Sequence, residues 1–139
     1  MKHYGSAFEY ERERNHDLMK AYKEEIRTCG FISVPEVCAR IVEKPSARFW
    51  VSEERAAIII SHIMRGGSLE NMRPQKKEMF EEIYRRAMAL KEKLPHLSPY
   101  QLAYRVVRQP APKFYLTPGS AKTIICKIRN KWYEKRKRR

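Results

Sequence analysis

The chain has 139 residues, of which 42% are hydrophobic and 33% charged, and its formal net charge is +14. This length permits one medium domain or two very small ones that share a core. No stretch approaches the ~18 to 20 uncharged apolar residues of a membrane-spanning helix, and 1–13 lack the apolar centre of a secretory signal, so we expect a cytoplasmic protein with no membrane partner.

The first helices are predicted from spacing and capping residues. Apolar residues three or four positions apart predict a long helix over 9–28, with Gly30 as its C-terminal stop. Ser33 and Glu36 have the spacing of a capping box, which predicts the start of a short helix. Pro45 ends that helix, because proline disfavours helical geometry in the residue before it.

A third helix is predicted over 53–65, with Ser52 as its N-terminal cap and Gly66 as its breaker. Its apolar residues recur at helical spacing and are expected to form one buried stripe: Ala56, Ile59, Ile60, Ile63 and Met64.

The second half repeats this order of elements. A long amphipathic helix is predicted over 75–94. Ser98 and Gln101 predict a capping box for a short helix. Thr117, followed by a proline, predicts the cap of a last helix. This helix is predicted over 118–131, and its last turn is expected to continue through Trp132. No segment alternates between apolar and polar residues with a period of two, so the predicted fold class is all-α.

An internal repeat relates the two halves at an offset of 65 residues. Residues 32–65 align without a gap on residues 97–130, with identical residues at nine of 34 positions. We therefore predict a compact bundle of about six helices from two tandem three-helix repeats, 1–67 and 68–139, with a basic tail from about residue 133. The identical pairs are Ser33/Ser98, Arg40/Arg105, Val42/Val107, Pro45/Pro110, Phe49/Phe114, Ala56/Ala121, Ile59/Ile124, Ile60/Ile125 and Ile63/Ile128.

The layout of each copy, a three-helix unit whose last two helices follow a turn, resembles the helix-turn-helix modules of DNA-binding proteins. The connectors, 44–51 and 109–116, are about eight residues long, whereas the usual turn has three or four. We therefore describe the repeats as helix-turn-helix-like and transfer no base contacts. Each connector holds two aromatic residues, interpreted as core anchors rather than as platforms for base stacking.

The positive charge is concentrated in the second half. Residues 1–67 have 11 Lys and Arg against 10 Asp and Glu, a net charge of +1, whereas residues 68–139 have 19 against 6, a net charge of +13. A concentrated positive charge is typical of proteins that hold a polyanion, because neutralising phosphates releases condensed counterions.

The last helix is the predicted contact helix. Small hydroxyl residues near its start and lysines further along suit contacts with a phosphate backbone. The predicted nucleic-acid-binding residues are Arg105, Arg108, Lys113, Ser120, Lys122, Thr123, Lys127, Asn130, Lys131, Lys135 and Arg136. The alternative interpretation of this segment is an ordinary amphipathic surface helix.

Catalytic and metal-binding motifs are not found in the sequence. The four histidines have no repeated spacing to Asp, Glu or Cys, and there is no phosphate-binding glycine loop or nucleophile elbow. The three cysteines, Cys29, Cys38 and Cys126, are an odd number at unrelated spacings, which favours reduced thiols over a disulfide framework or a zinc site. We expect a non-enzymatic protein without cofactor or metal.

These observations predict a small DNA-binding accessory or regulatory protein that contacts phosphates through its C-terminal half, with DNA favoured over RNA. The near-neutral N-terminal half would face solvent, a protein partner or a second protomer. The alternative is a protein-interaction or assembly module whose basic tail is incidental.

Overall fold

The computed structural model describes the backbone of residues 4–29 and 33–137 and the side chains of residues 10–29 and 33–131. Within these ranges the chain forms helices and no strand, so the predicted all-α class is confirmed. The six helices are α1 (Tyr4–Cys29), α2 (Val34–Ile41), α3 (Glu53–Met64), α4 (Pro74–Lys93), α5 (Pro99–Val107) and α6 (Pro118–Lys137).

The predicted cap residues start the helices; the structure shows a complete capping box at Ser98 and Gln101, but only the cap hydrogen bond of Ser33 at the box predicted for Ser33 and Glu36. Ser33 and Ser52 each accept a hydrogen bond on Oγ from the backbone N–H three residues later, at 3.3 and 3.1 Å. Ser98 and Gln101 form both hydrogen bonds of a capping box, at 3.2 and 2.9 Å. The predicted stop at Gly30 lies outside the described residues.

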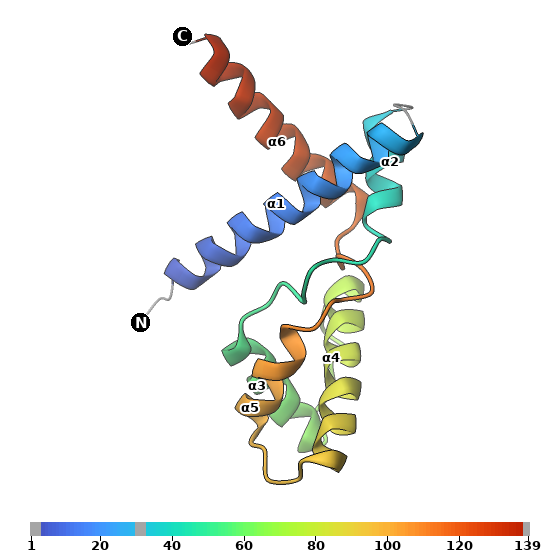
Figure 1. Cartoon of the computed structure of the whole chain (residues 1–139). Coiled ribbons are helices and arrows are strands. Elements are labelled where there is room, and N and C mark those ends of the chain that lie inside the picture. Colours follow the sequence, from blue (N-terminus) through green and yellow to red (C-terminus); the bar gives the residue numbers. More distant parts are fainter. Residues whose placement is uncertain (1–3, 30–32, 138–139) are drawn as a thin grey trace.

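The helices pack in two groups, and each group takes helices from both halves of the chain. α1, α2 and α6 surround one core, and α3, α4 and α5 surround the other (Figure 1). α3 therefore packs on two helices that follow it in the second half, and α6 packs on two helices of the first half. The division of the chain at residue 67 follows the sequence repeat and stays a prediction.

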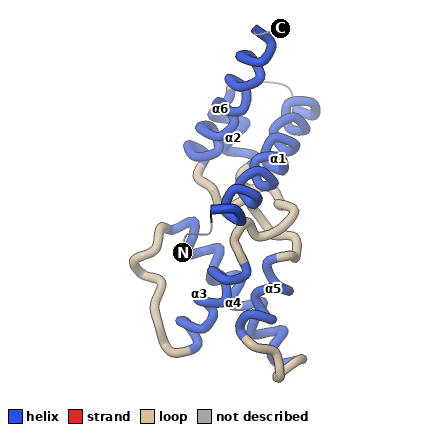
Figure 2. The backbone as a smooth tube through the Cα atoms, turned by 90° about the vertical axis from the view of Figure 1, so that its left-hand side faces the viewer, coloured by secondary structure: helices blue, strands red, loops and turns tan. Residues whose placement is uncertain are grey.

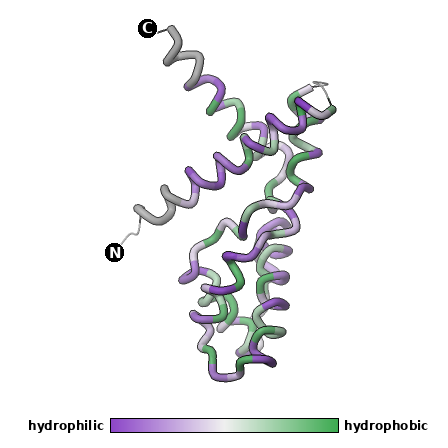
Figure 3. The backbone as a smooth tube through the Cα atoms, in the orientation of Figure 1, coloured by the Kyte–Doolittle hydropathy of each residue, from purple (hydrophilic) through white to green (hydrophobic). Residues whose placement is uncertain are grey.

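Each core is built from the apolar stripes of its three helices (Figure 3). The side chains of Leu18, Ile41 and Ile125 are fully buried in the first core, and those of Ile60 and Ile83 in the second. Four of the five positions in the predicted stripe of α3 pack into the second core. The prediction for the fifth was wrong, because Met64, the last residue of α3, is 40% exposed.

Two connectors join the helix groups and run side by side between them (Figures 1 and 2). Ser46 and Ala111 form an isolated antiparallel β-bridge, with N–H to carbonyl distances of 3.0 and 3.1 Å. The buried hydroxyl of Ser46 donates to the carbonyl oxygen of Arg48 at 2.8 Å. Connectors of this length are too short to form more than such a minimal pairing.

The phenylalanines of the two connectors are buried in different cores. The N–H of Phe49 donates to the carbonyl of Val107 at 3.0 Å, and its ring is fully buried among α3, α4 and α5. The N–H of Phe114 donates to the carbonyl of Val42 at 3.2 Å, and its ring is buried among α1, α2 and α6. The interpretation of these aromatics as core anchors is confirmed at both positions.

A search of the described residues for membrane-spanning segments finds no helix of sufficient length and hydrophobicity.

Candidate nucleic-acid interface

α6 has one face in the core and one in solvent. Ala121 and Ile125 are fully buried against α1 and α2, and Ile128 is half-buried beside them. The remaining positions form an exposed surface that we call the basic face of α6, and residues 118–131 include no carboxylate. The basic face consists of Gly119, Ser120, Lys122, Thr123, Lys127, Asn130 and Lys131.

The start of α6 is fixed by local hydrogen bonds. Thr117 Oγ1 accepts from the backbone N–H of Ser120 at 3.1 Å, which is the cap that the sequence predicts. The hydroxyl of Thr123 donates to the carbonyl of Gly119 one turn earlier, at 3.0 Å. These bonds order the first turns of α6 and keep its small polar side chains at the surface.

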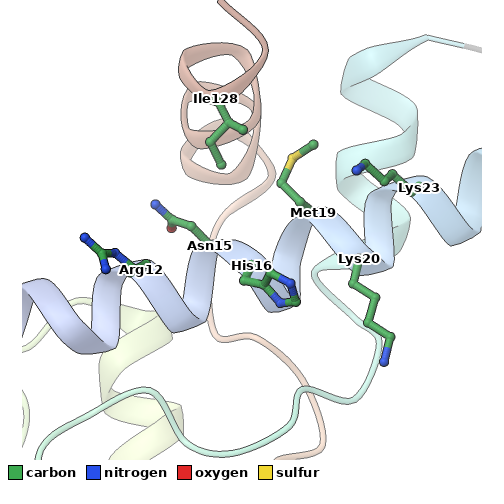
Figure 4. Close-up of a pocket in the computed structure, with 7 residues that line it drawn as sticks. All are labelled: Arg12, Asn15, His16, Met19, Lys20, Lys23 and Ile128. Carbon is green, nitrogen blue, oxygen red and sulfur yellow. The ribbon is translucent and has the colours of Figure 1, made fainter. Parts of the chain in front are cut away.

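A groove runs along one side of α1 where α6 packs on that helix, and we call it the α1–α6 groove. It has a volume of about 390 Å³ and is lined by Ile128 together with Arg12, Asn15, His16, Met19, Lys20 and Lys23 of α1 (Figure 4). The α1 residues follow one another at alternating intervals of three and one, which places them on one side of a helix. Among the described residues that line the groove, α1 contributes three cations and no acid, and α6 contributes only Ile128.

Two acids of α1 bind neighbouring segments and do not line the groove. Asp17 Oδ2 accepts a hydrogen bond from the backbone N–H of Ala47 in the first connector, at 2.8 Å. Glu25 is buried and forms ion pairs with Lys44 and with Arg40, the latter at 3.6 Å. The hydrogen bond from Lys44 is the main reason that the pKa of Glu25 lies below its ordinary value.

α6 is tied to α1 by a polar contact as well as by the core. The guanidinium of Arg129 donates to the hydroxyl oxygen of Tyr22 at 3.4 Å, and Tyr22 is itself buried in the core of this helix group. The contact adds a polar interaction to the apolar packing between α6 and α1.

Three predicted contact residues lie apart from the basic face of α6. Arg105 is exposed on α5, in the other helix group. Arg108 pairs with Glu53, and its guanidinium stacks over the ring of Tyr104 at 3.6 Å from the centroid. Their contact with nucleic acid stays a prediction.

Lys113 lies between two carboxylates. Its ammonium is 2.5 Å from Glu78 and 3.8 Å from Glu43, and the hydrogen bond to Glu78 is the main reason that its pKa is raised. Arg108 and Lys113 thus have structural partners that compensate their charge. The side chains of Lys135 and Arg136 lie outside the described residues, although the backbone of both belongs to α6.

The cations of α1 were not identified from the sequence as part of the candidate interface. Counting charges over the whole first half gave a net charge of +1 and concealed the acid-free side that includes Arg12, Lys20 and Lys23. The helical spacing of these residues was available in the sequence. Only the packing of α6 on α1 shows that these residues line a groove together with Ile128.

No group of three or more His, Cys, Asp or Glu side chains that could hold a metal ion occurs among the described residues. No family model matches the chain, and no match was found among curated proteins or solved structures.

Proposed function

We propose that the protein is a non-enzymatic DNA-binding protein, a small accessory or regulatory factor that acts in the cytoplasm and contacts phosphates through the basic face of α6, with the cations of the α1–α6 groove as additional contacts. The observation that carries the proposal is the basic face of α6, where Lys122, Lys127 and Lys131 are exposed and residues 118–131 include no carboxylate. A surface with one sign of charge raises the local concentration of a polyanion more than isolated surface lysines do.

The charges of α6 are available for a partner. No ion pair in the described part of the chain involves Lys122, Lys127 or Lys131, and all three side chains are exposed. Other cations of the second half, such as Arg86 and Lys113, do form ion pairs within the chain. Lysines without an internal carboxylate release counterions when they meet phosphates, which favours binding.

The shape of α6 favours duplex DNA over duplex RNA. Its 20 residues span about 30 Å, and an α-helix fits the major groove of B-DNA, which is about 12 Å wide. The major groove of A-form RNA is too deep and narrow to admit side chains from a helix. Asn130 and Thr123 are the polar side chains of the basic face best suited to contacts with base edges.

A mobility-shift assay on a random duplex of about 20 base pairs tests this proposal at two salt concentrations. We expect wild-type affinity to fall steeply between about 50 and 200 mM salt. Changing both Lys127 and Lys131 to glutamate is expected to weaken binding at low salt at least about tenfold and to reduce the salt slope by about two.

The matched control reverses two cations in the other helix group, Lys91 and Lys93 on α4. It changes the net charge by the same amount, so a specific interface predicts that its affinity stays close to that of the wild type. Equal losses in the two variants, or no binding of the wild type at low salt, would contradict the proposal.

We also infer that the two halves descend from one duplicated three-helix unit with a helix-turn-helix-like layout. The hydrogen bonds of the connectors support this inference. Phe49 and Val107 stand 65 positions from Phe114 and Val42, so the two long-range bonds are equivalent under the repeat. Ser46 and Ala111, the bridge partners, are also 65 positions apart.

A further inference from the structure

A second groove lies on the other helix group, between α3 and the loop that joins α3 to α4, and we call it the α3–α4 groove. Its volume is about 690 Å³. Figure 2 shows the loop bowing away from the helices. Arg55 and Arg65 enter this groove from α3 or its C-terminal cap, and Arg73 and Lys76 from the start of α4. No carboxylate lines it.

The charge of this groove is not compensated within the described part of the chain. No ion pair there involves Arg55, Arg65, Arg73 or Lys76. The groove thus concentrates four cations that have no carboxylate partner within the described part of the chain. Such a surface repels cationic partners and attracts carboxylates or phosphates.

The lining of the groove is also apolar. Ile58 is 58% exposed, more than any other large hydrophobic side chain in the described part of the chain. Ile59, Leu69 and Met72 line the groove with it. A single exposed isoleucine is ordinary, but an exposed isoleucine within a groove that has a basic rim is typical of a protein-binding surface.

The groove is held in shape before any partner binds. α3 ends in a Schellman motif, in which the N–H groups of Gly66 and Gly67 donate to the carbonyls of Ile63 and His62 at 2.9 and 2.8 Å. The imidazole Nε2 of His62 lies 3.1 Å from the carbonyl oxygen of Ser68. A preformed groove loses little conformational entropy on binding.

We propose that the α3–α4 groove binds an acidic amphipathic helix of a partner protein. The apolar residues of such a helix would cover Ile58 and Met72, and its carboxylates would pair with the rim, where guanidinium groups bind carboxylates in bidentate geometry. From Arg55 to Arg65, α3 spans about 15 Å, enough for about three turns of the partner helix. A phosphate backbone would match the cations but would leave the apolar lining uncovered.

The probe for this proposal is a fluorescent synthetic peptide of about 14 residues, four helical turns. It has leucines at positions i, i+3, i+4 and i+7 and glutamates on the flanking positions. Fluorescence anisotropy with the full chain measures its affinity. We expect Kd to increase at least tenfold in Ile58→Glu, and likewise in a variant with Arg55→Glu and Arg65→Glu. Ile58 is largely exposed, so its replacement should leave the helical circular dichroism unchanged.

Two control peptides decide what the groove recognises. A peptide with serines in place of the leucines is expected to bind at least tenfold more weakly, and so is a peptide with lysines in place of the glutamates. Equal binding of the serine peptide would overturn the proposal in favour of a general polyanion surface. Displacement of the peptide by a DNA duplex, or no peptide binding, would also overturn it.

This proposal stands apart from DNA binding by α6. The Lys127→Glu, Lys131→Glu variant is expected to bind the acidic peptide as the wild type does. The Ile58→Glu variant is expected to retain its affinity for duplex DNA. Each proposal therefore fails or succeeds on its own variant.

Discussion

At the scale of single residues, Glu53 links three parts of the chain. Its carboxylate accepts a hydrogen bond from the hydroxyl of Tyr10 at 3.0 Å and pairs with Arg108, and it is 6% exposed. Burial raises the pKa of Glu53. Hydrogen bonds from its own backbone N–H and from Tyr10, together with the charge of Arg108, lower the pKa by more than burial raises it. The result is a pKa below the ordinary value of 4.5.

This shift predicts a pH dependence of stability. A lowered pKa stabilises the folded state above pH 4.5, and that stability is lost as the pH falls through the folded pKa. Glu53→Gln is expected to lower the free energy of unfolding at pH 7 by about 2 kcal/mol. Urea titrations at pH 7 and at low pH should show the difference between wild type and variant shrinking on acidification. A constant difference would contradict this account.

A second feature at the scale of single residues is the backbone conformation of Gly66. Its φ is +86°, a left-handed conformation that residues with a Cβ rarely adopt. No atom lies within 4 Å of a Cβ built at this position, so the effect of Gly66→Ala is conformational. We expect the free energy of unfolding to fall by about 1 kcal/mol.

Gly67→Ala provides the comparison, because a Cβ there would lie 2.3 Å from the ring of His62. It should displace His62 and weaken peptide binding in the α3–α4 groove, which Gly66→Ala should affect less. Urea denaturation and the anisotropy assay together separate the two effects. Equal peptide affinities in both variants would argue against a role for His62 in shaping the groove.

At the scale of elements, the two connectors determine which core α3 and α6 each join. Phe49 anchors the first connector in the core of α3, α4 and α5, where its ring stacks on that of Tyr115 with centroids 6.0 Å apart. Tyr115 has a φ of 58°. Burial of its hydroxyl is the main reason that the pKa of Tyr115 is raised to about 12. Phe114 has the corresponding place in the other core.

Truncating either aromatic anchor is expected to destabilise the chain by about 3 to 5 kcal/mol, because each ring leaves a cavity in a closed core. Phe49→Ala should first reduce hydrogen-exchange protection in α3, α4 and α5, and Phe114→Ala in α1, α2 and α6. Exchange measured by mass spectrometry distinguishes the two patterns. Identical loss of protection across all helices would indicate that the two cores unfold as one unit.

At the scale of the whole molecule, each helix group needs helices from both halves of the chain. Ala56 and Ile60 of α3 are fully buried against helices of the second half, and Ala121 and Ile125 of α6 against helices of the first. A half chain would therefore expose the buried face of its third helix to water.

Fragments 1–67 and 68–139 are thus expected to have low helicity apart and to form a folded one-to-one complex when mixed. Far-UV circular dichroism and size-exclusion chromatography check this expectation, with the intact chain as the reference. A fragment that folds alone with native helicity would contradict it.

Local signals accounted for much of what could be predicted. Ser52, Ser98 and Thr117 start their helices because a cap needs only the backbone N–H groups next to it in sequence. The apolar stripes could likewise be recognised from helical spacing. The α1–α6 groove and the α3–α4 groove could not, because both bring together residues that helix packing or loop geometry makes neighbours.

The sequence alone thus determined the helices, their caps, their buried faces and the surplus of positive charge, since these depend on residue type and local spacing. The tertiary structure decided which helices share a core and which cations face one another. A hydrophobic stripe specifies that a helix must be covered but not by which partner. Here the short connectors decided the packing partners. They direct α3 onto α4 and α5, and they direct α6 onto α1 and α2.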